Sequence, residues 1–291
     1  MKKMSDILPY FLSNLKEFYP DNEIKSFAYI TIKYFFDMSK SDTIINSEKK
    51  LEDREIMEIK STISSLKRYE PIQYVFMETE FYGNSFFSIC GSLIPRPETE
   101  ELVDWIIKDN KGTKKHYLDI GTGSGCIIIS LSKHLNGSFT GIDVSFDALK
   151  VAVANNDRNE TDVYFDKFDI LKHDLPEGKN ILDDSIFYEY DVIVSNPPYV
   201  LNSEKEQMSE NVLKWEPHLA LFVPDEDPLL FYREIAEKSS KALNPNGLLY
   251  FEINEKFGKK IVKLLEDFGF VNIELKKDIN DKDRMVKAVW K

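Results

Sequence analysis

Apolar residues recur at helical spacing through residues 1 to about 75. Two stripes each follow one face of a helix, and their members are Ile24, Phe27, Ala28, Thr31 and Phe35, then Ile56, Ile59, Ile63 and Leu66. Pro20 and Asp21 suit the start of the first helix. No pattern in this region indicates chemistry. Residues 1–75 are therefore predicted to form a helical domain, which either recognises a partner or acts as a structural cap.

The pattern changes to aromatic and β-branched residues between Phe81 and Ile94. Two turn signals, Gly83-Asn84 and Cys90-Gly91, interrupt it. The sequence predicts a β-hairpin in this region, and residues 76–95 are assigned to a hairpin linker between two domains.

From residue 96 onward, short apolar runs alternate with amphipathic segments. The expected strands are residues 116–120, 139–143, 163–165, 192–195, 248–253, 271–276 and 285–290. The expected helices are residues 126–135, a segment capped by Ser145, and residues 228–243 and 261–268. Strands separated by helices of this length imply parallel pairing with right-handed crossovers, and the last two strands are expected to form an antiparallel edge pair. Residues 96–291 are predicted to be a Rossmann-like α/β domain with a mainly parallel, seven-stranded sheet.

A glycine-rich turn follows the first expected strand of this domain and leads directly into a helix. It reads Asp119-Ile120-Gly121-Thr122-Gly123-Ser124-Gly125. Glycines let the backbone approach a ligand closely, and a helix start offers amide hydrogens and a positive dipole end. The spacing G-x-G-x-G lacks the third glycine of the dinucleotide fingerprint. The turn therefore predicts a cofactor site without specifying a dinucleotide.

Acidic residues around this turn favour S-adenosylmethionine as the cofactor. Asp143 ends the next expected strand, where a carboxylate can accept hydrogen bonds from both ribose hydroxyls. Asp119 is placed to meet a cationic amino group, which suits S-adenosylmethionine better than a pyrophosphate-bearing cofactor. The alternative is that both aspartates only cap helices or turns. Asp169-Ile170 is predicted to line the adenine. The predicted cofactor contacts are Asp119, Gly121, Thr122, Gly123, Ser124, Gly125, Asp143, Asp169, Ile170 and Asn196.

The run Asn196-Pro197-Pro198-Tyr199 follows the apolar strand ending at Ser195. Two prolines end the strand and leave nearby carbonyls without ladder partners. The Asn196 side-chain oxygen and the Pro197 backbone oxygen are predicted to accept both hydrogens of a planar NH2 group, with Tyr199 packed on its plane. The alternative is an ordinary strand-ending turn. Carboxyl ends of parallel strands share one sheet edge, so this corner is expected to meet the glycine turn. The predicted catalytic residues are Asn196, Pro197 and Tyr199, and the predicted substrate contacts are Asn196, Pro197, Pro198 and Tyr199.

Composition limits the partners. The chain of 291 residues carries a formal net charge of -12, which argues against a stable nucleic-acid partner. Cys90 and Cys126 have neither disulfide nor metal spacing, so no metal is expected. No apolar run reaches the roughly 18 residues of a membrane span, so a cytoplasmic protein is expected. The protein is also expected to be a monomer. The four histidines are expected to be structural or exposed, namely His116, His134, His173 and His218.

Taken together, these motifs resemble the release factor glutamine methyltransferase family of class I S-adenosylmethionine-dependent methyltransferases. The resemblance covers most of the chain and rests on the segments 71–74, 81–83, 93–100, 121–125, 193–199 and 216–217, with further likeness at 277–278 and 283–284. One departure is Phe76-Met77, where the family usually has a glycine, and it concerns only the local turn before the hairpin.

The resemblance implies a substrate, the glutamine of the Gly-Gly-Gln motif in peptide chain release factors. It also implies that the helical domain holds the release factor. Arg96, Glu98 and Glu100 either form a salt-bridged helix start or act at the mouth of the cleft. Three alternatives are considered. A glutamine methyltransferase acting on a ribosomal protein shares the Asn-Pro-Pro-Tyr run, and so does an adenine methyltransferase acting on DNA, although the acidic balance of the chain counts against the latter. The third is a non-catalytic binding protein that keeps the cofactor fold, and the intact Asn-Pro-Pro-Tyr run counts against it.

Overall fold

The chain folds into two compact units. The computed structural model describes residues 1–175, 178–179, 186–187 and 190–291. The helical unit comprises Met1–Met77 together with Ser209–Trp215, and the sheet unit comprises Glu78–Met208 together with Glu216–Lys291. The chain therefore leaves the sheet unit at Ser209 and returns to it at Glu216.

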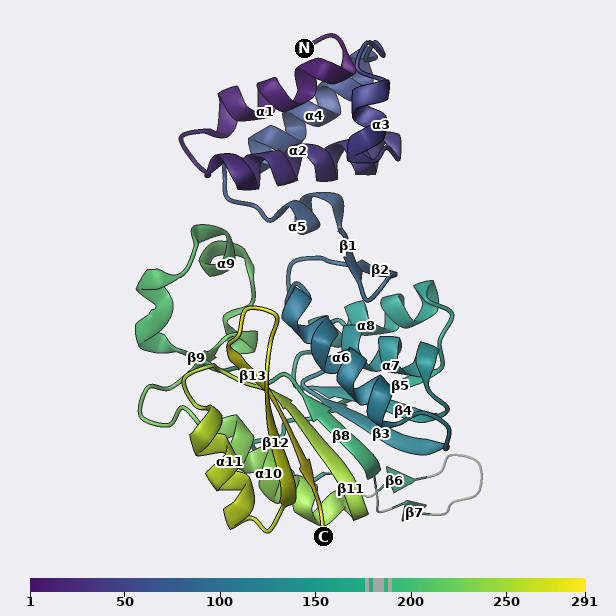
Figure 1. Cartoon of the computed structure of the whole chain (residues 1–291), viewed down its shortest axis with the longest axis vertical. Coiled ribbons are helices and arrows are strands. Elements are labelled where there is room, and N and C mark those ends of the chain that lie inside the picture. The colour runs from purple at the N-terminus through teal and green to yellow at the C-terminus, as the bar shows by residue number, and fades with distance from the viewer. Residues whose placement is uncertain (176–177, 180–185, 188–189) are drawn as a thin grey trace. The chain divides into compact units, whose positions relative to one another are not determined.

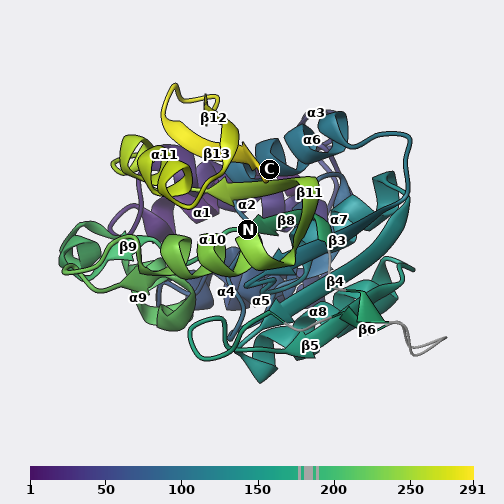
Figure 2. The same ribbon diagram turned by 90° about the horizontal axis from the view of Figure 1, so that it is seen from below.

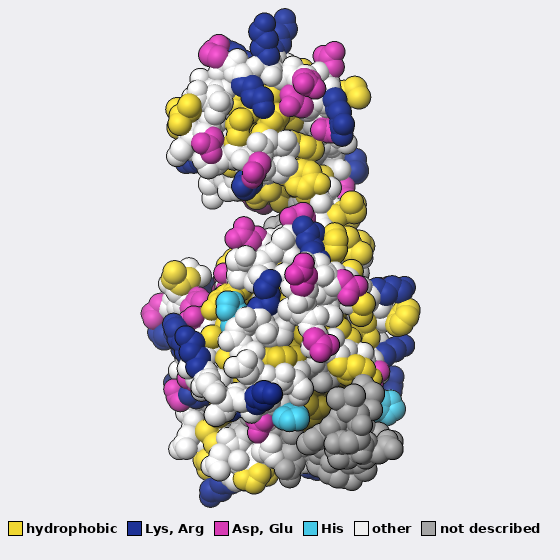
Figure 3. Space-filling view, turned by 90° about the vertical axis from the view of Figure 1, so that its right-hand side faces the viewer, with side chains coloured by type: hydrophobic (Ala, Val, Ile, Leu, Met, Phe, Trp, Pro, Cys, Tyr) yellow, Lys and Arg dark blue, Asp and Glu magenta, His cyan; other side chains and the backbone are white. Residues whose placement is uncertain are grey.

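The helical unit is built around one apolar core (Figure 1). Its elements are η1 (Met4–Asp6), α1 (Ile7–Leu15), α2 (Asp21–Phe36), α3 (Lys40–Ile45), α4 (Asp53–Leu66), α5 (Ile72–Phe76) and α9 (Glu210–Trp215). The two apolar stripes of the sequence supply much of this core from α2 and α4. The face of the helical unit in Figure 3 shows hydrophobic side chains among charged ones.

The short helix α9 joins the helical unit through the end of α4. Trp215 Nε1 donates a hydrogen bond to the Arg68 carbonyl oxygen at 3.2 Å. The Lys214 ammonium lies 4.8 Å from the centroid of the Tyr69 ring. No sequence signal in residues 209–215 indicated this membership, because both contacts bridge about half the chain.

A tight hairpin opens the sheet unit. Strands β1 (Glu78–Phe81) and β2 (Asn84–Phe87) pair antiparallel across Tyr82-Gly83, whose φ values of 48° and 70° are typical of a two-residue turn. The expectation that the hairpin extends to Ile94 is wrong. Met77 is left-handed (φ 54°) just before β1, so β1 has only four residues and no strand residue remains to pair beyond Phe87.

Seven strands form the main sheet in the order β12-β13-β11-β8-β3-β4-β5. Their bounds are β3 (Lys115–Ile120), β4 (Gly137–Asp143), β5 (Val163–Lys167), β8 (Tyr190–Ser195), β11 (Leu243–Glu252), β12 (Val271–Lys277) and β13 (Asp283–Val289). Pairing is parallel from β11 through β5, while β13 runs antiparallel to both of its neighbours. The predicted mainly parallel, seven-stranded, Rossmann-like sheet is thus confirmed, as is the antiparallel pairing of its last two strands.

Helices cover both faces of this sheet (Figures 1 and 2). The covering helices are α6 (Pro97–Asp109), α7 (Cys126–His134), α8 (Phe146–Arg158), α10 (Leu230–Ala242) and α11 (Gly258–Asp267). Successive side chains of a strand point to opposite faces of the sheet, so each strand contributes to two apolar cores. Tyr117 and Val192 pack with α6 and α7, whereas Leu118 and Ile193 pack with α10 and α11.

Short elements complete the sheet unit. They are β6 (Gly178–Lys179), β7 (Ile186–Phe187), β9 (Val200–Leu201), η2 (Asn202–Gln207), η3 (His218–Ala220) and β10 (Phe222–Val223). After β3 the chain adds β4 and β5 on one side, and then crosses to place β8 on the other side of β3. Loops leaving β3 and β8 therefore diverge at their carboxyl ends, which is where open α/β sheets bind ligands.

Candidate active site

A cavity of about 230 Å³ lies at the carboxyl ends of the central strands. Most of the predicted site residues line it, namely Gly121, Thr122, Gly123, Ser124, Asp143, Asp169, Ile170, Asn196, Pro197 and Pro198. Three predicted site residues are not part of its lining: Asp119, Gly125 and Tyr199. The glycine turn and the Asn-Pro-Pro corner thus share one cavity.

The three glycines of the turn have different structural roles. All three are left-handed, with φ values of 73° at Gly121, 57° at Gly123 and 80° at Gly125. A Cβ added at Gly121 would meet no atom within 4 Å, so open space lies in front of this backbone. At Gly125 an added Cβ would lie 2.9 Å from Ile129 Cδ1. Gly121 therefore keeps the cavity open, whereas Gly125 permits close packing of the turn against α7.

Asp143 holds the turn in place. Its Oδ2 accepts from the Gly123 amide at 2.9 Å, and its Oδ1 accepts from the Ser145 amide at 2.8 Å. Burial raises the pKa of the Asp143 carboxyl, while these backbone hydrogen bonds oppose that rise. Each carboxylate oxygen has further acceptor capacity beside the cavity, so Asp143 is positioned to accept hydrogen bonds from ligand hydroxyls.

Asp119 lies in β3, is fully buried and does not line the cavity. Its Oδ2 accepts from Thr122 Oγ1 at 2.7 Å, whereas its Oδ1 has no hydrogen-bond partner within the described residues. Burial raises the pKa of this carboxyl to about 7. A buried carboxylate oxygen without a donor is energetically costly, and a cationic ligand group nearby would relieve that cost.

Asp169 and Ile170 line the cavity. A hydrogen bond from Lys172 lowers the pKa of Asp169, whose Oδ2 lies 2.8 Å from the Lys172 ammonium. The nearly buried Lys238 of α10 donates to the Ile170 carbonyl oxygen. This backbone is therefore fixed by an internal cation, and the apolar Ile170 side chain is available to pack against a flat ring.

The corner after β8 presents unsatisfied acceptors. Asn196 Nδ2 donates to Thr99 Oγ1 at 3.3 Å, and Ser195 Oγ donates to the Ile120 carbonyl oxygen at 2.6 Å. No donor among the described residues reaches Asn196 Oδ1 or the Pro197 carbonyl oxygen. Both oxygens are therefore available to a ligand, and their contact with a substrate NH2 group stays a prediction.

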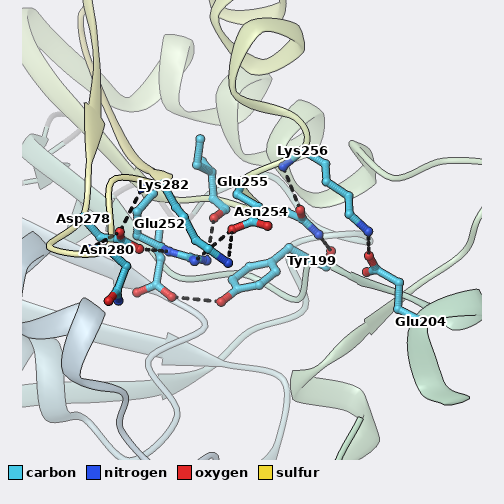
Figure 4. Close-up of polar contacts among 11 residues, drawn as sticks. Tyr199, Glu204, Glu252, Asn254, Glu255, Lys256, Asp278, Asn280 and Lys282 are labelled. Atoms are coloured by element: carbon cyan, nitrogen blue, oxygen red, sulfur yellow. Dashed lines mark hydrogen bonds and ion pairs between the residues drawn. The ribbon is translucent and has the colours of Figure 1, made fainter. Parts of the chain in front are cut away.

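Tyr199 is anchored by polar contacts to Glu252 and Asn254 (Figure 4). Its hydroxyl donates to Glu252 Oε1 at 3.1 Å, and its carbonyl oxygen accepts from Asn254 Nδ2 at 3.1 Å. Burial raises the pKa of the phenol far above its usual value. Packing of its ring on a substrate amide stays a prediction.

Arg96 lies between the cavity and a buried carboxylate, and a role at the cleft mouth stays a prediction. It lines the cavity, and its Nη2 donates to Glu216 Oε1 at 2.7 Å. Glu216 Oε2 also accepts from the Ile94 amide at 3.2 Å. Glu98 and Glu100 do not line the cavity, and Glu100 accepts from the Tyr82 amide at the hairpin turn.

Sequence reasoning missed Thr99 and Glu252. Thr99 Oγ1 donates to Glu252 Oε2 at 2.6 Å and simultaneously accepts from Asn196. No local signal could have found this pair, because the two residues lie 153 positions apart.

The four histidines do not line the cavity. Among the described residues, no group of three or more His, Cys, Asp or Glu side chains is arranged to hold a metal ion. None of the described helices has the length and apolarity needed to cross a membrane.

Comparisons with known proteins agree with this geometry. A family model described as a methyltransferase domain matches residues 111–291. The chain is 47% identical over 286 residues to the release factor glutamine methyltransferase of Flavobacterium psychrophilum, covering 96% of each chain. It is 41% identical to the Bacteroides thetaiotaomicron enzyme of the same name, covering 98% of this chain and 99% of that one.

A solved structure shares the fold. A putative SAM-dependent methyltransferase from Streptococcus mutans aligns with 73% of this chain and 55% of its own, at 14% identity and a TM-score of 0.50. The glycine turn, the Asn-Pro-Pro-Tyr corner and the near full-length relatives lead to one conclusion. The chain belongs to the release factor glutamine methyltransferase family.

Proposed function

We propose that this enzyme transfers a methyl group from S-adenosylmethionine to the side-chain amide nitrogen, N5, of the glutamine in the Gly-Gly-Gln motif of peptide chain release factors. The observation that carries the proposal is the pair of free acceptors, Asn196 Oδ1 and the Pro197 carbonyl oxygen, beside a cavity lined by the glycine turn. The names of the full-length relatives support the release factor as substrate.

The residues of the cavity fit S-adenosylmethionine. Asp143 offers carboxylate oxygens for ribose hydroxyls, and Ile170 offers an apolar surface for adenine. Outside the lining, the unpartnered, buried Oδ1 of Asp119 next to Thr122 favours positive charge nearby. Open space in front of Gly121 allows the cofactor to approach the protein backbone closely. When bound, the cofactor supplies an electrophilic methyl group on a sulfonium.

Asn196 and Pro197 compensate for the weak nucleophilicity of an amide. The amide lone pair is delocalised into its carbonyl. The enzyme must therefore lower the activation barrier by orienting the NH2 group and by stabilising the charge that develops on it. Two acceptors that grip both hydrogens of the NH2 group fix its direction, and orientation of this kind can contribute several kcal/mol. The same oxygens stabilise the positive charge that grows on nitrogen during alkylation. The alkylated amide is strongly acidic and loses its proton to solvent, so no general base is required.

The helical unit is the proposed docking site for the release factor. Its exposed apolar side chains include Ile30, Ile44, Ile45 and Met57, which are suited to contact a protein. A net charge of -12 disfavours a stable nucleic-acid complex. The proposed enzyme acts in the cytoplasm as a monomer, with its substrate as a transient partner.

Mass spectrometry of a release factor incubated with the enzyme and S-adenosylmethionine tests this function. One added methyl on the Gly-Gly-Gln glutamine is expected, with none when that glutamine is replaced by alanine. Asn196→Ala should lower turnover by about 10²-fold or more while leaving cofactor affinity close to wild type. Unmodified release factor, or methylation of ribosomal protein or adenine in DNA instead, would reject the proposal.

A further inference from the structure

A buried carboxylate beside the active corner has no part in the mechanism above. Glu252 is the last residue of β11, and its side chain is fully enclosed. Phe251 pairs with Ser195 across the parallel strands β11 and β8, so Glu252 lies beside Asn196. Burying a charge is costly unless hydrogen bonds or an opposite charge compensate.

Two hydroxyls compensate the Glu252 charge. Thr99 donates to Oε2 at 2.6 Å and Tyr199 donates to Oε1 at 3.1 Å. Figure 4 shows the Tyr199 contact, with Asp278 and other charged residues farther along the same network. Burial raises the pKa of the Glu252 carboxyl, while the two hydroxyl hydrogen bonds and the positive charge of Arg284 favour its ionised form. Arg284 Nε donates to Asp278 Oδ2 at 3.0 Å.

The number of protons available fixes the direction of the hydrogen bonds from Asn196 through Thr99 to Glu252. An ionised carboxylate only accepts hydrogen bonds, so each hydroxyl must direct its single proton at Glu252. Thr99 Oγ1 then has only lone pairs left for its second neighbour. That neighbour is the Asn196 amide at 3.3 Å, which must therefore present its NH2 side to Thr99. The oxygen side of the same amide consequently faces away from Thr99.

We propose that Glu252 is a positioning residue that sets the orientation of the Asn196 amide through Thr99, so that Oδ1 rather than Nδ2 meets the substrate. The inference rests on the proposed function, because it explains how one of the two substrate acceptors is aimed. An inverted amide would present two donors to a substrate NH2 group and would repel it. Glu252 thus acts on the reaction without touching substrate or cofactor.

The test compares three substitutions in turnover with release factor and S-adenosylmethionine. Thr99→Val removes the relay, and Glu252→Gln leaves one acceptor oxygen for two hydroxyls. Each should lower kcat about tenfold, the worth of one oriented hydrogen bond, with the Kd for S-adenosylmethionine and the KM for release factor within about twofold of wild type. Thr99→Ser keeps the hydroxyl and should restore most of the turnover.

A double variant separates orientation from general structural damage. When Thr99 is already valine, Glu252→Gln should cause no further loss of kcat. If the two substitutions acted independently, their tenfold losses would multiply, and kcat would fall about 10²-fold. Asp278→Asn is the matched control, since it also removes a buried carboxylate near Arg284 but does not contact Thr99. It should keep kcat within about twofold.

The outcomes distinguish this inference from the proposed function. If wild-type enzyme methylates the glutamine but Glu252→Gln and Thr99→Val keep wild-type kcat, the relay is refuted and the function stands. Multiplying losses in the double variant refute the relay as well. If Glu252→Gln fails to fold, wild-type kcat in Thr99→Val still refutes the relay, whereas a tenfold loss that Thr99→Ser restores still supports it. Absence of glutamine methylation by wild-type enzyme refutes the function itself.

Discussion

Replacing Asp119 with asparagine should change how the stability of the sheet unit depends on pH. The Asp119 carboxyl is fully buried, with one oxygen bonded to Thr122 and the other lacking a partner within the described residues. Burial raises its pKa from 3.8 to about 7. The folded protein therefore binds this proton more tightly than the unfolded chain does. The contribution to stability is complete below about pH 4 and is lost as pH rises towards 7.

The magnitude follows from the pKa. Each pH unit between the unfolded and folded pKa values changes the unfolding free energy by about 1.4 kcal/mol. From pH 5 to pH 7 the wild-type protein should lose about 2 kcal/mol through Asp119 alone, and only a little more above pH 7, because the carboxyl is half protonated at its pKa. Asparagine does not titrate. The unfolding free energy of Asp119→Asn, taken relative to wild type, should therefore rise by about 2 kcal/mol over this range.

Urea unfolding of both proteins without cofactor, at pH 5, 6, 7 and 8, measures this difference. Fluorescence reports on the sheet unit through Trp105 and Trp290. Other buried carboxyls, such as Asp143 and Glu252, are present in both proteins and largely cancel in the comparison. A difference between the two proteins that stays constant across pH would show that Asp119 does not carry a raised pKa, and would refute this reasoning.

Three further outcomes are expected. Asp143→Ala should weaken S-adenosylmethionine binding about 10- to 100-fold by calorimetry, through lost hydrogen bonds to ribose, and wild-type affinity would remove Asp143 from the site. Gly125→Ala should lower the unfolding free energy by about 2 kcal/mol, because its Cβ meets Ile129. Gly121→Ala should cost less stability but more cofactor affinity, and the reverse ranking would contradict the two glycine roles. Met77→Gly should raise the unfolding free energy by about 0.5 kcal/mol, because Met77 is left-handed and its side chain is exposed, while Met77→Ala should give no gain.

Local patterns were sufficient to predict the parts of the site that lie next to regular elements. The Gly121–Gly125 turn and the Asn196 corner each follow an apolar strand, and parallel strands bring their carboxyl ends to one edge. Hydrophobic alternation predicted the sheet for the same reason. Strand ends shifted by one to several residues, as at β11, because pairing with neighbours rather than composition decides where a strand stops.

Contacts over long sequence distances were beyond reach. Glu252 reads as an ordinary polar residue after an apolar strand, and only the fold brings Thr99 to it. The same limit hid the burial of Asp119, which does not line the cavity, so its contact with a cofactor stays a prediction. The predicted hairpin is too long because its limit is the left-handed backbone at Met77. Methionine rarely adopts this conformation, so the residue type gives no local signal for it.

The membership of residues 209–215 in the helical unit has a consequence for synthesis and for dissection of the chain. Trp215 is bonded to Arg68, while the next residue, Glu216, holds Arg96 and Ile94. The helical unit therefore cannot be completed until the ribosome has passed residue 215, by which time much of the central sheet has already been made. A chain shortened to residues 1–77 would lack α9, and one beginning at residue 78 would carry α9 without its partners. No single cut separates the two units into complete halves.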